Sequence, residues 1–155
     1  MGPGEGASLG DVRAARELGA LVAAEGWALV TGGRACGVME AASRGAREAG
    51  GLTVGVLPGV DAADASEFVD LAVVTGMGQA RNQINVLTSR VVFACGAGAG
   101  TASEIALAIK ARRPVILLRA TAEARAFFAA LGRDAVHFAD TPREAVDIAR
   151  TLLRG

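Results

Sequence analysis

Apolar and polar positions along this chain follow two spacings, one typical of helices and one typical of buried strands. After Ser8, apolar residues recur every three or four positions as far as Gly26, and Ser8 and Asp11 have the spacing of a helix capping box. The run WALVTGG that follows is apolar without helical spacing and ends in glycines, which is typical of a buried strand. The succession of strand, turn and helix then repeats to the end of the chain.

The remaining elements are predicted from the same two patterns. Apolar runs with little alternation predict strands that are covered on both faces, and therefore a parallel sheet. The sequence thus predicts an α/β fold with a doubly wound, mostly parallel open sheet of the Rossmann-like kind, in a single domain over residues 1–155. Helices are expected at 37–51, 77–89, 101–112, 123–131 and 142–153, and strands at 52–59, 68–76, 90–96, 114–118 and 135–140.

The beginning of the chain does not fit this scheme. Folds of this kind usually open with a strand that lies centrally in the sheet. Here the chain opens with MGPGEGAS, which is typical of the loop that follows such a strand. Either the sheet lacks its first strand or the chain starts late.

Composition and charge narrow the function further. The 16 basic and 16 acidic residues give a net charge of zero, which argues against binding to nucleic acid or to an anionic membrane. No apolar run approaches the roughly 18–20 residues that span a bilayer, and no signal peptide is recognisable, so a cytoplasmic protein is expected. Cys36 and Cys95 fit no metal or redox spacing and are expected to be small buried residues. The sequence predicts no metal site and no resident cofactor.

The segment TGGRACGVM contains a first candidate anion site. Gly32 and Gly33 end a predicted strand, and Gly37 lies where the next helix begins. A helix N-terminus offers free N–H groups and partial positive charge, and Arg34 adds a cation. The spacing is not that of the dinucleotide fingerprint, so an ordinary tight turn remains the alternative.

The segment CGAGAGTASE contains a second candidate. Gly96, Gly98 and Gly100 follow a predicted strand, and Thr101 opens the next helix; no lysine follows, so this is not a Walker A loop. In an open α/β sheet both glycine loops lie at the carboxyl ends of strands, where ligands bind. Glu104 is expected in the first helical turn, where it either complements the helix dipole or contacts a part of the ligand other than its phosphate.

The predicted helix at 77–89 supplies further polar side chains. Arg81 has the geometry to clamp a phosphate, or else it pairs structurally with Glu104 or a partner subunit. Asn82 follows it, and Asn85 lies one turn on, on the same face as Arg81. His137 is the only histidine, so no Ser/His/Asp or Cys/His triad is predicted.

Three motifs in this order, GG…GVMEAASRGAREAGGLTVGVLPG, ARN and GAGAGTASE, resemble the Rossmann-like "possible lysine decarboxylase" superfamily. Its members include the lonely-guy cytokinin-activating phosphoribohydrolases, and the chain is more similar to the small bacterial branch related to the molybdenum cofactor carrier protein. The resemblance covers roughly residues 11–118. It implies a homodimer or higher homo-oligomer with a ligand pocket near the strand ends.

In the phosphoribohydrolases, an Arg of the middle motif and the Glu that ends the Gly-Thr motif are catalytic, and these match Arg81 and Glu104. They cleave the N-glycosidic bond of a nucleoside 5′-monophosphate. In the carrier branch, the same loops hold an anionic pterin without chemistry. The hydrolases carry Pro-Gly-Gly-x-Gly-Thr and Arg-Lys, whereas this chain has Ala97 in the loop and Asn82 after Arg81. A pyridoxal decarboxylase is not predicted, because Lys110, the only lysine, lies late in a helix.

These observations favour a binding protein for a nucleotide or another phosphate-bearing small molecule, such as a pterin-type cofactor. A nucleoside 5′-monophosphate phosphoribohydrolase is the second hypothesis. A structural domain without a ligand, whose glycine loops are only turns, is the third.

Overall fold

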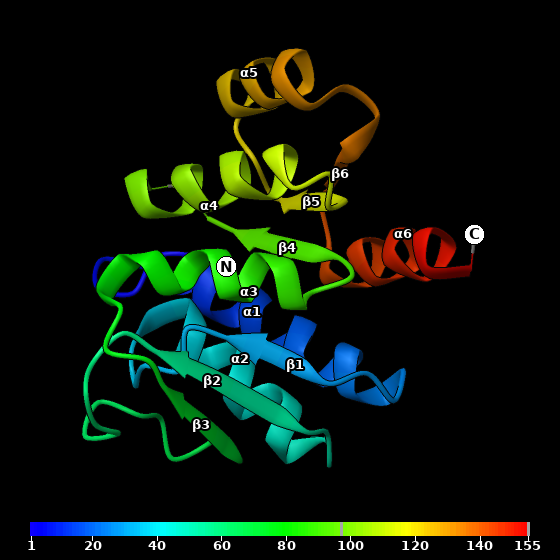
Figure 1. Ribbon diagram of the computed structural model, residues 1–155. Helices are drawn as coiled ribbons and strands as arrows, with labels where there is room; N and C mark the ends of the chain where they lie inside the picture. The colour runs from blue at the N-terminus through cyan, green and yellow to red at the C-terminus, as the bar shows by residue number, and fades with distance from the viewer. Residues whose placement is uncertain (97, 155) are drawn as a thin grey trace.

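The computed structural model describes residues 1–96 and 98–154 of the chain. Strands and helices alternate along almost its whole length, as the sequence predicts (Figure 1). The strands are β1 (Leu29–Thr31), β2 (Thr53–Leu57), β3 (Leu71–Val74), β4 (Val92–Cys95), β5 (Val115–Leu118) and β6 (Val136–Ala139). The helices are α1 (Leu9–Ala24), α2 (Gly37–Glu48), α3 (Asn82–Thr88), α4 (Ala99–Lys110), α5 (Ala122–Gly132) and α6 (Pro142–Arg154), with 3-10 turns η1 (Gly78–Arg81) and η2 (Arg133–Ala135).

The strands form two parallel sheets of three strands each, in the orders β1-β2-β3 and β4-β5-β6. Val54 pairs with Leu71 in the first sheet, and Phe93 pairs with Ile116 in the second. The α/β, Rossmann-like fold is therefore confirmed. The expected single sheet is divided between β1 and β4, which is where a central first strand would lie in this topology.

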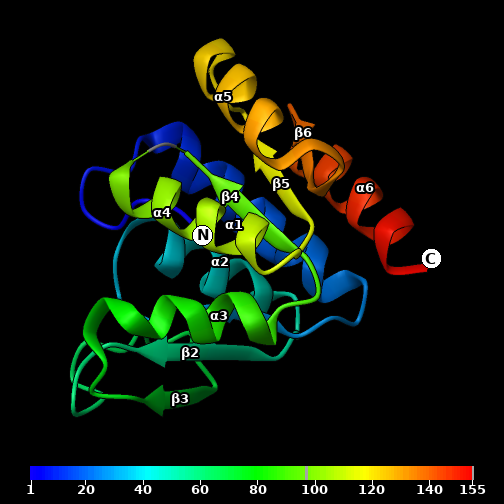
Figure 2. The same ribbon diagram turned by 45° about the horizontal axis from the view of Figure 1, so that its top comes forward.

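Helices cover both faces of the sheets. In Figure 1, α3 lies in front of the strands and α1 and α2 lie behind them, and Figure 2 shows the same arrangement from above. Within β5, Ile116 and Leu118 join the core formed with α1, α2 and α6, whereas Val115 and Leu117 join the core formed with α3, α4 and α5. This alternation explains the continuous apolar run in the sequence, because both faces of the strand are buried.

Helix α1 is fixed at both ends and along its length. The Ser8 hydroxyl accepts a hydrogen bond from the Asp11 N–H at 3.1 Å, and Gly26 leaves the helix with a φ of +73°. A Cβ atom added at Gly19 would overlap the carbonyl oxygen of Ala42, and one at Gly45 would overlap that of Arg16. The glycines therefore let α1 and α2 pack backbone to backbone, which fixes the position of the α2 N-terminus.

The predicted helices 101–112 and 77–89 differ from the structure. Helix α4 begins at Ala99 rather than 101, because Gly98 is extended and acts as N-cap, and it ends at Lys110. The predicted helix 77–89 is divided into η1 and α3, and Gly78 enters η1 with a φ of +55°, which favours glycine. None of the helices in the described residues is both long and apolar enough to cross a membrane.

Candidate functional site

Both predicted glycine loops lie on one edge of the molecule. β1 ends at Thr31 and leads into α2, and β4 ends at Cys95 and leads into α4; all the strands run parallel, so their carboxyl ends share one side (Figure 1, left). The N-cap residues of α2 and α4 are Cys36 and Gly98, and neither gives its helix a side-chain hydrogen bond. Each helix end therefore has partial positive charge and no side-chain cap, which suits an anion.

The N-terminal loop forms a third wall that the sequence analysis recognised only as a loop. The Pro3 carbonyl oxygen accepts a hydrogen bond from the Val38 N–H at 3.0 Å, in the first turn of α2. A Cβ atom at Gly4 would lie 2.9 Å from the Cys36 Sγ, and one at Gly98 would lie 3.9 Å from Pro3. Residues 1–4 thus pass between the two glycine loops, and their glycine content was the signal for this close approach.

Arg81 reaches the first glycine loop from a different part of the chain. A Cβ atom at Gly32 would lie 2.8 Å from the Arg81 Nη2 and would overlap its Nη1, so the guanidinium rests on the bare backbone of Gly32. Burial lowers the pKa of Arg81, an effect that Glu104 opposes and that the nearby Arg34 adds to. An arginine remains charged even so. The structure therefore brings two arginines of the predicted site together.

Several polar side-chain atoms of the predicted site and of the neighbouring Asn85 are buried without a hydrogen-bond partner among the described residues. They are the Arg81 Nε, the Asn82 Oδ1, the Asn85 Oδ1 and the Thr101 Oγ1. Thr101 is only 3% exposed, although it stands in the first turn of α4. Buried polar groups in folded proteins are nearly always paired, so a cluster of unpaired ones indicates a place for a ligand or ordered water.

Glu104 does not have the position expected for it. Because α4 begins at Ala99, Glu104 lies in the second turn rather than the first, so it does not complement the N-terminal end of the helix dipole. Burial raises its pKa, although the Met1 amino group and Arg81 lower it. Among the described residues no ion pair joins Glu104 to Arg81 within 4.0 Å, so the predicted structural pairing is not formed.

The other predicted glycines divide into two groups. Gly33, Gly37 and Gly96 have φ angles of +75°, +52° and +77°, and their α-carbons approach neighbouring atoms closely. They shape the loops, because a Cβ atom at any of the three would come within 3.0 Å of a neighbouring atom and the backbone conformation would be strained. Gly98 and Gly100 are exposed, with room for a Cβ atom, so they border open space rather than backbone. Ala97, between them, lies outside the described residues.

The remaining candidate groups do not join the site. Cys95 is buried, and burial raises the pKa of its thiol to about 11, so it stays neutral. Cys36 is only partly buried, contrary to expectation, because it caps α2 beside the N-terminal loop. Lys110 is the last residue of α4, at the end of the helix opposite the glycine loop. The described residues contain no cluster of three or more ligands for a metal ion.

One further arginine at the same edge escaped the sequence analysis. A Cβ atom at Gly10, in the first turn of α1, would lie 2.9 Å from the Arg119 Nη1. Arg119 directly follows β5 and adopts a φ of +57°, which is unusual for a residue other than glycine. Nothing in its local sequence distinguishes it from the other arginines.

A cavity of about 740 Å³ adjoins the site. It extends between β1 and β4, and Gly32 and Glu104 line it at the carboxyl end of these strands. Glu104 therefore belongs both to the predicted site and to the lining of this cavity.

Comparison with known proteins identifies a matching family and similar solved structures. The model of the SLOG cluster4 family matches residues 1–146. The molybdenum cofactor binding protein from the phototrophic bacterium Rippkaea orientalis is 50% identical, with a TM-score of 0.96, over 99% of this chain and 94% of that one. The Moco carrier protein of Chlamydomonas reinhardtii is 48% identical, with a TM-score of 0.94, over the same shares of the two chains.

A relative of undescribed function is also similar. An uncharacterized protein from Archaeoglobus fulgidus is 42% identical over 107 residues, which are 69% of this chain and 70% of that protein. Together these matches confirm the predicted resemblance to the branch related to the molybdenum cofactor carrier protein.

Proposed function

This chain belongs to the SLOG cluster4 family, and from that premise we propose that it binds a phosphate-bearing small molecule of pterin or nucleotide type and releases it unchanged. The structural relatives named for binding or carrying the molybdenum cofactor make an anionic pterin the leading candidate. The observation that carries the proposal is that two hydrogen-bond donors of the predicted site, the Arg81 Nε and the Thr101 Oγ1, are buried without a partner among the described residues. An anion with several oxygens would pair with both donors.

Charge and backbone support the same ligand. Arg81 and Arg34 lie close together, which is unfavourable unless an anion is placed near them. The end of α4 adds backbone N–H groups that no side chain caps, and Arg81 offers a planar donor pair for phosphate. At α2 the Val38 N–H is bonded to Pro3, so this helix end contributes chiefly its partial positive charge. In this proposal Gly98 and Gly100 let the ligand approach the backbone, Gly32 seats the Arg81 guanidinium, and Gly33, Gly37 and Gly96 shape the loops.

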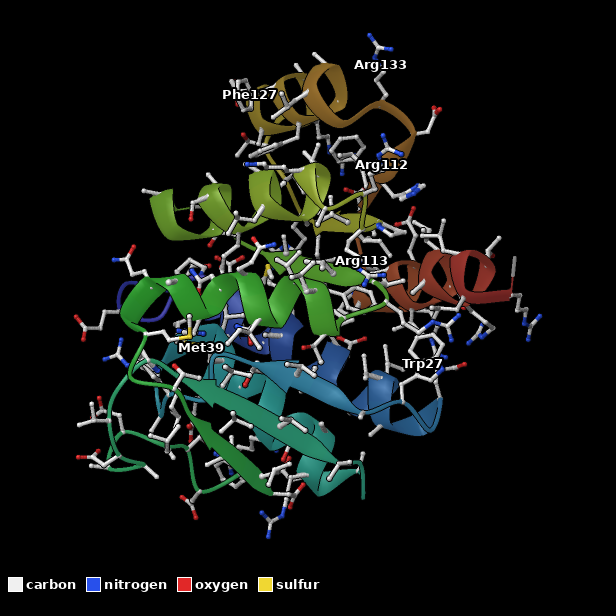
Figure 3. The ribbon with its side chains drawn as sticks, in the orientation of Figure 1. Trp27, Met39, Arg112, Arg113, Phe127 and Arg133 are labelled. Atoms are coloured by element: carbon white, nitrogen blue, oxygen red, sulfur yellow. The ribbon has the colours of Figure 1, made fainter. Side chains whose placement is uncertain are left out.

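The test is direct binding with a matched arginine control. AMP, GMP and inorganic phosphate are titrated against wild type, Arg81→Ala and Arg133→Ala, and any ligand that copurifies is identified by mass. Arg133 is exposed at the amino end of β6, far from the glycine loops (Figure 3). A hydrogen-bonded charge contributes about 2 kcal/mol, so Arg81→Ala should weaken binding about 30-fold and Arg133→Ala should leave it unchanged. Absence of both a copurified ligand and any titratable binding would contradict the proposal.

A phosphoribohydrolase is retained as a second candidate because of Glu104. Its carboxyl is partly buried and lies outside the first turn of α4, so helix capping does not account for it. Beside a bound ribose, a carboxylate would stabilise the positive charge that develops as the N-glycosidic bond breaks. Chromatography of AMP incubated with wild type and Glu104→Gln decides between the candidates. Free adenine from wild type alone favours the hydrolase, and intact AMP with both proteins favours the carrier.

We also propose that the chain forms a homodimer through the outer strand of the first sheet. Leu71, Val73 and Val74 of β3 are 56%, 38% and 43% exposed, and Met77 and Leu87 nearby are 50% and 51% exposed. An exposed apolar edge strand is unfavourable in a monomer. Light scattering should give twice the chain mass for wild type and the chain mass for Leu71→Arg. A monomeric wild type at micromolar concentration would contradict this interface.

A further inference from the structure

Positive charge without ion-pair partners gathers at the amino end of the second sheet. The turn from α4 into β5 contains Arg112 and Arg113, directly after Lys110, and the turn from α5 into β6 contains Arg133. In the described part of the chain, none of these four cations has a carboxylate within 4.0 Å. Asp134 is the only acidic residue in the two turns, so this end of a neutral chain is locally basic.

The two turns form one surface. β5 and β6 are neighbouring parallel strands, so their amino ends lie together. A Cβ atom at Gly132 would lie 3.0 Å from the Ile109 side chain, so the end of α5 packs on the end of α4. Figure 3 shows Arg112 and Arg133 at the same edge of the molecule. We call this surface the basic edge, and its members are Lys110, Arg112, Arg113 and Arg133.

Arg112 has a backbone conformation that favours glycine. Its φ is +54°, and its N–H bonds to the Ile109 carbonyl oxygen to close the last turn of α4. The ends of α1 and α2 are closed in the same way, but there the left-handed residues are Gly26 and Gly50. The helix dipole accounts for a cation in the last turn of α4, but not for arginine at a left-handed position. The side chain of Arg112 therefore has a use that glycine would not provide.

Exposed apolar side chains adjoin the basic edge on α5. Phe127 and Leu131 are 63% and 52% exposed, and because they are four positions apart they lie on the same face of the helix. Leu131 stands two residues before Arg133. Aromatic and other apolar side chains next to arginines are typical of protein–protein interfaces.

We propose that the basic edge and this face of α5 form one docking surface for an acidic, amphipathic segment of a partner protein. Apolar side chains of the segment would pack on Phe127 and Leu131. Its carboxylates would pair with the guanidinium groups of Arg112 and Arg133. The glycine loops lie at the opposite ends of the strands, so docking here leaves the proposed ligand site open.

Two carboxylates on the same surface favour a protein over a polyanion. Glu123 is exposed one turn before Phe127 on the same face of α5, and Asp134 is exposed directly after Arg133. Nucleic acid and anionic membrane are negative throughout, so either would repel both groups. A protein segment can place an amide or a cation opposite them.

The test measures binding of a labelled peptide made of two Leu-Glu-Asp-Leu-Glu-Glu-Asp repeats, which as a helix has its leucines on one face. Arg133→Glu should weaken its binding at least tenfold, and Phe127→Ala about threefold to tenfold, by fluorescence anisotropy. Arg13→Glu is the matched charge control, because Arg13 is exposed on α1, on the other face of the sheets, and it should bind as wild type does.

Arg112→Gly separates a docking role from a folding role. Glycine suits the left-handed φ, so this variant should raise the Tm by about 2–4 °C, yet it should weaken peptide binding about threefold to tenfold. Affinity lost while stability rises does not come from misfolding. The affinity of each variant for AMP should equal that of wild type, so the outcome is independent of the proposed anion site.

Three outcomes would overturn the proposal. The first is equal peptide affinity for wild type, Arg112→Gly and Arg133→Glu, or equal affinity for the peptide and for its version with serine in place of leucine. The second is tighter binding of single-stranded DNA or of phosphatidylserine vesicles than of the peptide at about 150 mM salt, which would assign the surface to a polyanion. The third is self-association of wild type that Phe127→Ala abolishes, because a second copy would then cover this face.

Discussion

Gly32→Ala should weaken ligand binding while leaving the protein folded. The φ of Gly32 lies outside the left-handed region, so alanine adopts its backbone conformation without strain. The added Cβ atom would overlap the Arg81 Nη1 and lie 2.6 Å from the Met39 Sδ, and both atoms end flexible side chains. The guanidinium must therefore leave the glycine loop, and the backbone need not move.

The expected magnitudes follow from these contacts. Alanine in place of glycine stabilises a compatible site by about 0.4–1 kcal/mol through the unfolded chain, and displacing two flexible side chains costs a similar amount. The free energy of unfolding should thus change by less than about 1 kcal/mol. A lost charge-assisted contact to phosphate is worth about 1.5–3 kcal/mol, so the Kd should rise about 10- to 150-fold.

The assay needs stability and affinity on the same samples. Urea denaturation gives the free energy of unfolding, and calorimetric titration with AMP or with the copurified ligand gives the Kd. Gly59→Ala is the matched control, because its nearest contact would be the Asp61 carbonyl oxygen at 3.7 Å and its φ is not left-handed. It should leave both quantities unchanged. If Gly32→Ala binds as tightly as wild type, the placement of Arg81 on this loop has no part in binding.

Three further outcomes are expected. Gly33→Ala should lower the free energy of unfolding by about 2–4 kcal/mol, because alanine would have to adopt a left-handed φ of +75° and its Cβ atom would lie 2.9 Å from the Gly55 Cα. An unchanged midpoint in urea denaturation would refute this strain. Gly19→Ala should lower the free energy of unfolding by about 1–3 kcal/mol despite the better helix propensity of alanine, because α1 and α2 must separate. Gly100→Ala is the control in open space within α4, and it should raise the free energy of unfolding by up to about 1 kcal/mol. The raised pKa of Glu104 means that the folded state holds this proton more tightly than the unfolded state does. Its contribution to stability is therefore present at low pH and is lost as the pH rises from the ordinary value of 4.5 through the raised pKa. Glu104→Gln should therefore have a higher Tm than wild type at pH 7 and a similar one at pH 4, and a constant Tm difference between pH 4 and pH 7 would contradict the raised pKa.

The elements that the sequence predicted best are those whose ends are set by a few neighbouring residues. The capping hydroxyl of Ser8 and the left-handed Gly26 define α1, and both are recognisable in a few residues. The apolar run of β5 is also a local signal, and it predicted that both faces of this strand are buried. The start of α4 was misjudged because Ala99 and Gly100 have no strong N-terminal signal, and the extended conformation of Gly98 that sets the boundary is not visible in the sequence.

The site was predicted in outline because parallel strands bring their carboxyl ends to one edge. The sequence could not predict that the Arg81 guanidinium rests on Gly32, since that contact depends on η1, an element that was taken for regular helix. It also could not predict whether Glu104 faces the helix end or the cavity, because a shift of two residues in the start of α4 decides this. Arg119 was missed because its contact with Gly10 of α1 depends on tertiary packing, which the sequence does not show.

The N-terminal segment connects the edge of β4 with the start of α2. Met1 pairs with the edge of β4, and two residues later the Pro3 carbonyl oxygen accepts the Val38 N–H at the start of α2. Gly4 then passes against Gly37, in the first turn of α2. These contacts hold the loop between the two helix ends that are proposed to bind the anion. Their order should favour ligand binding as well as stability, because a wall of the site that is already ordered does not have to be ordered when the ligand binds.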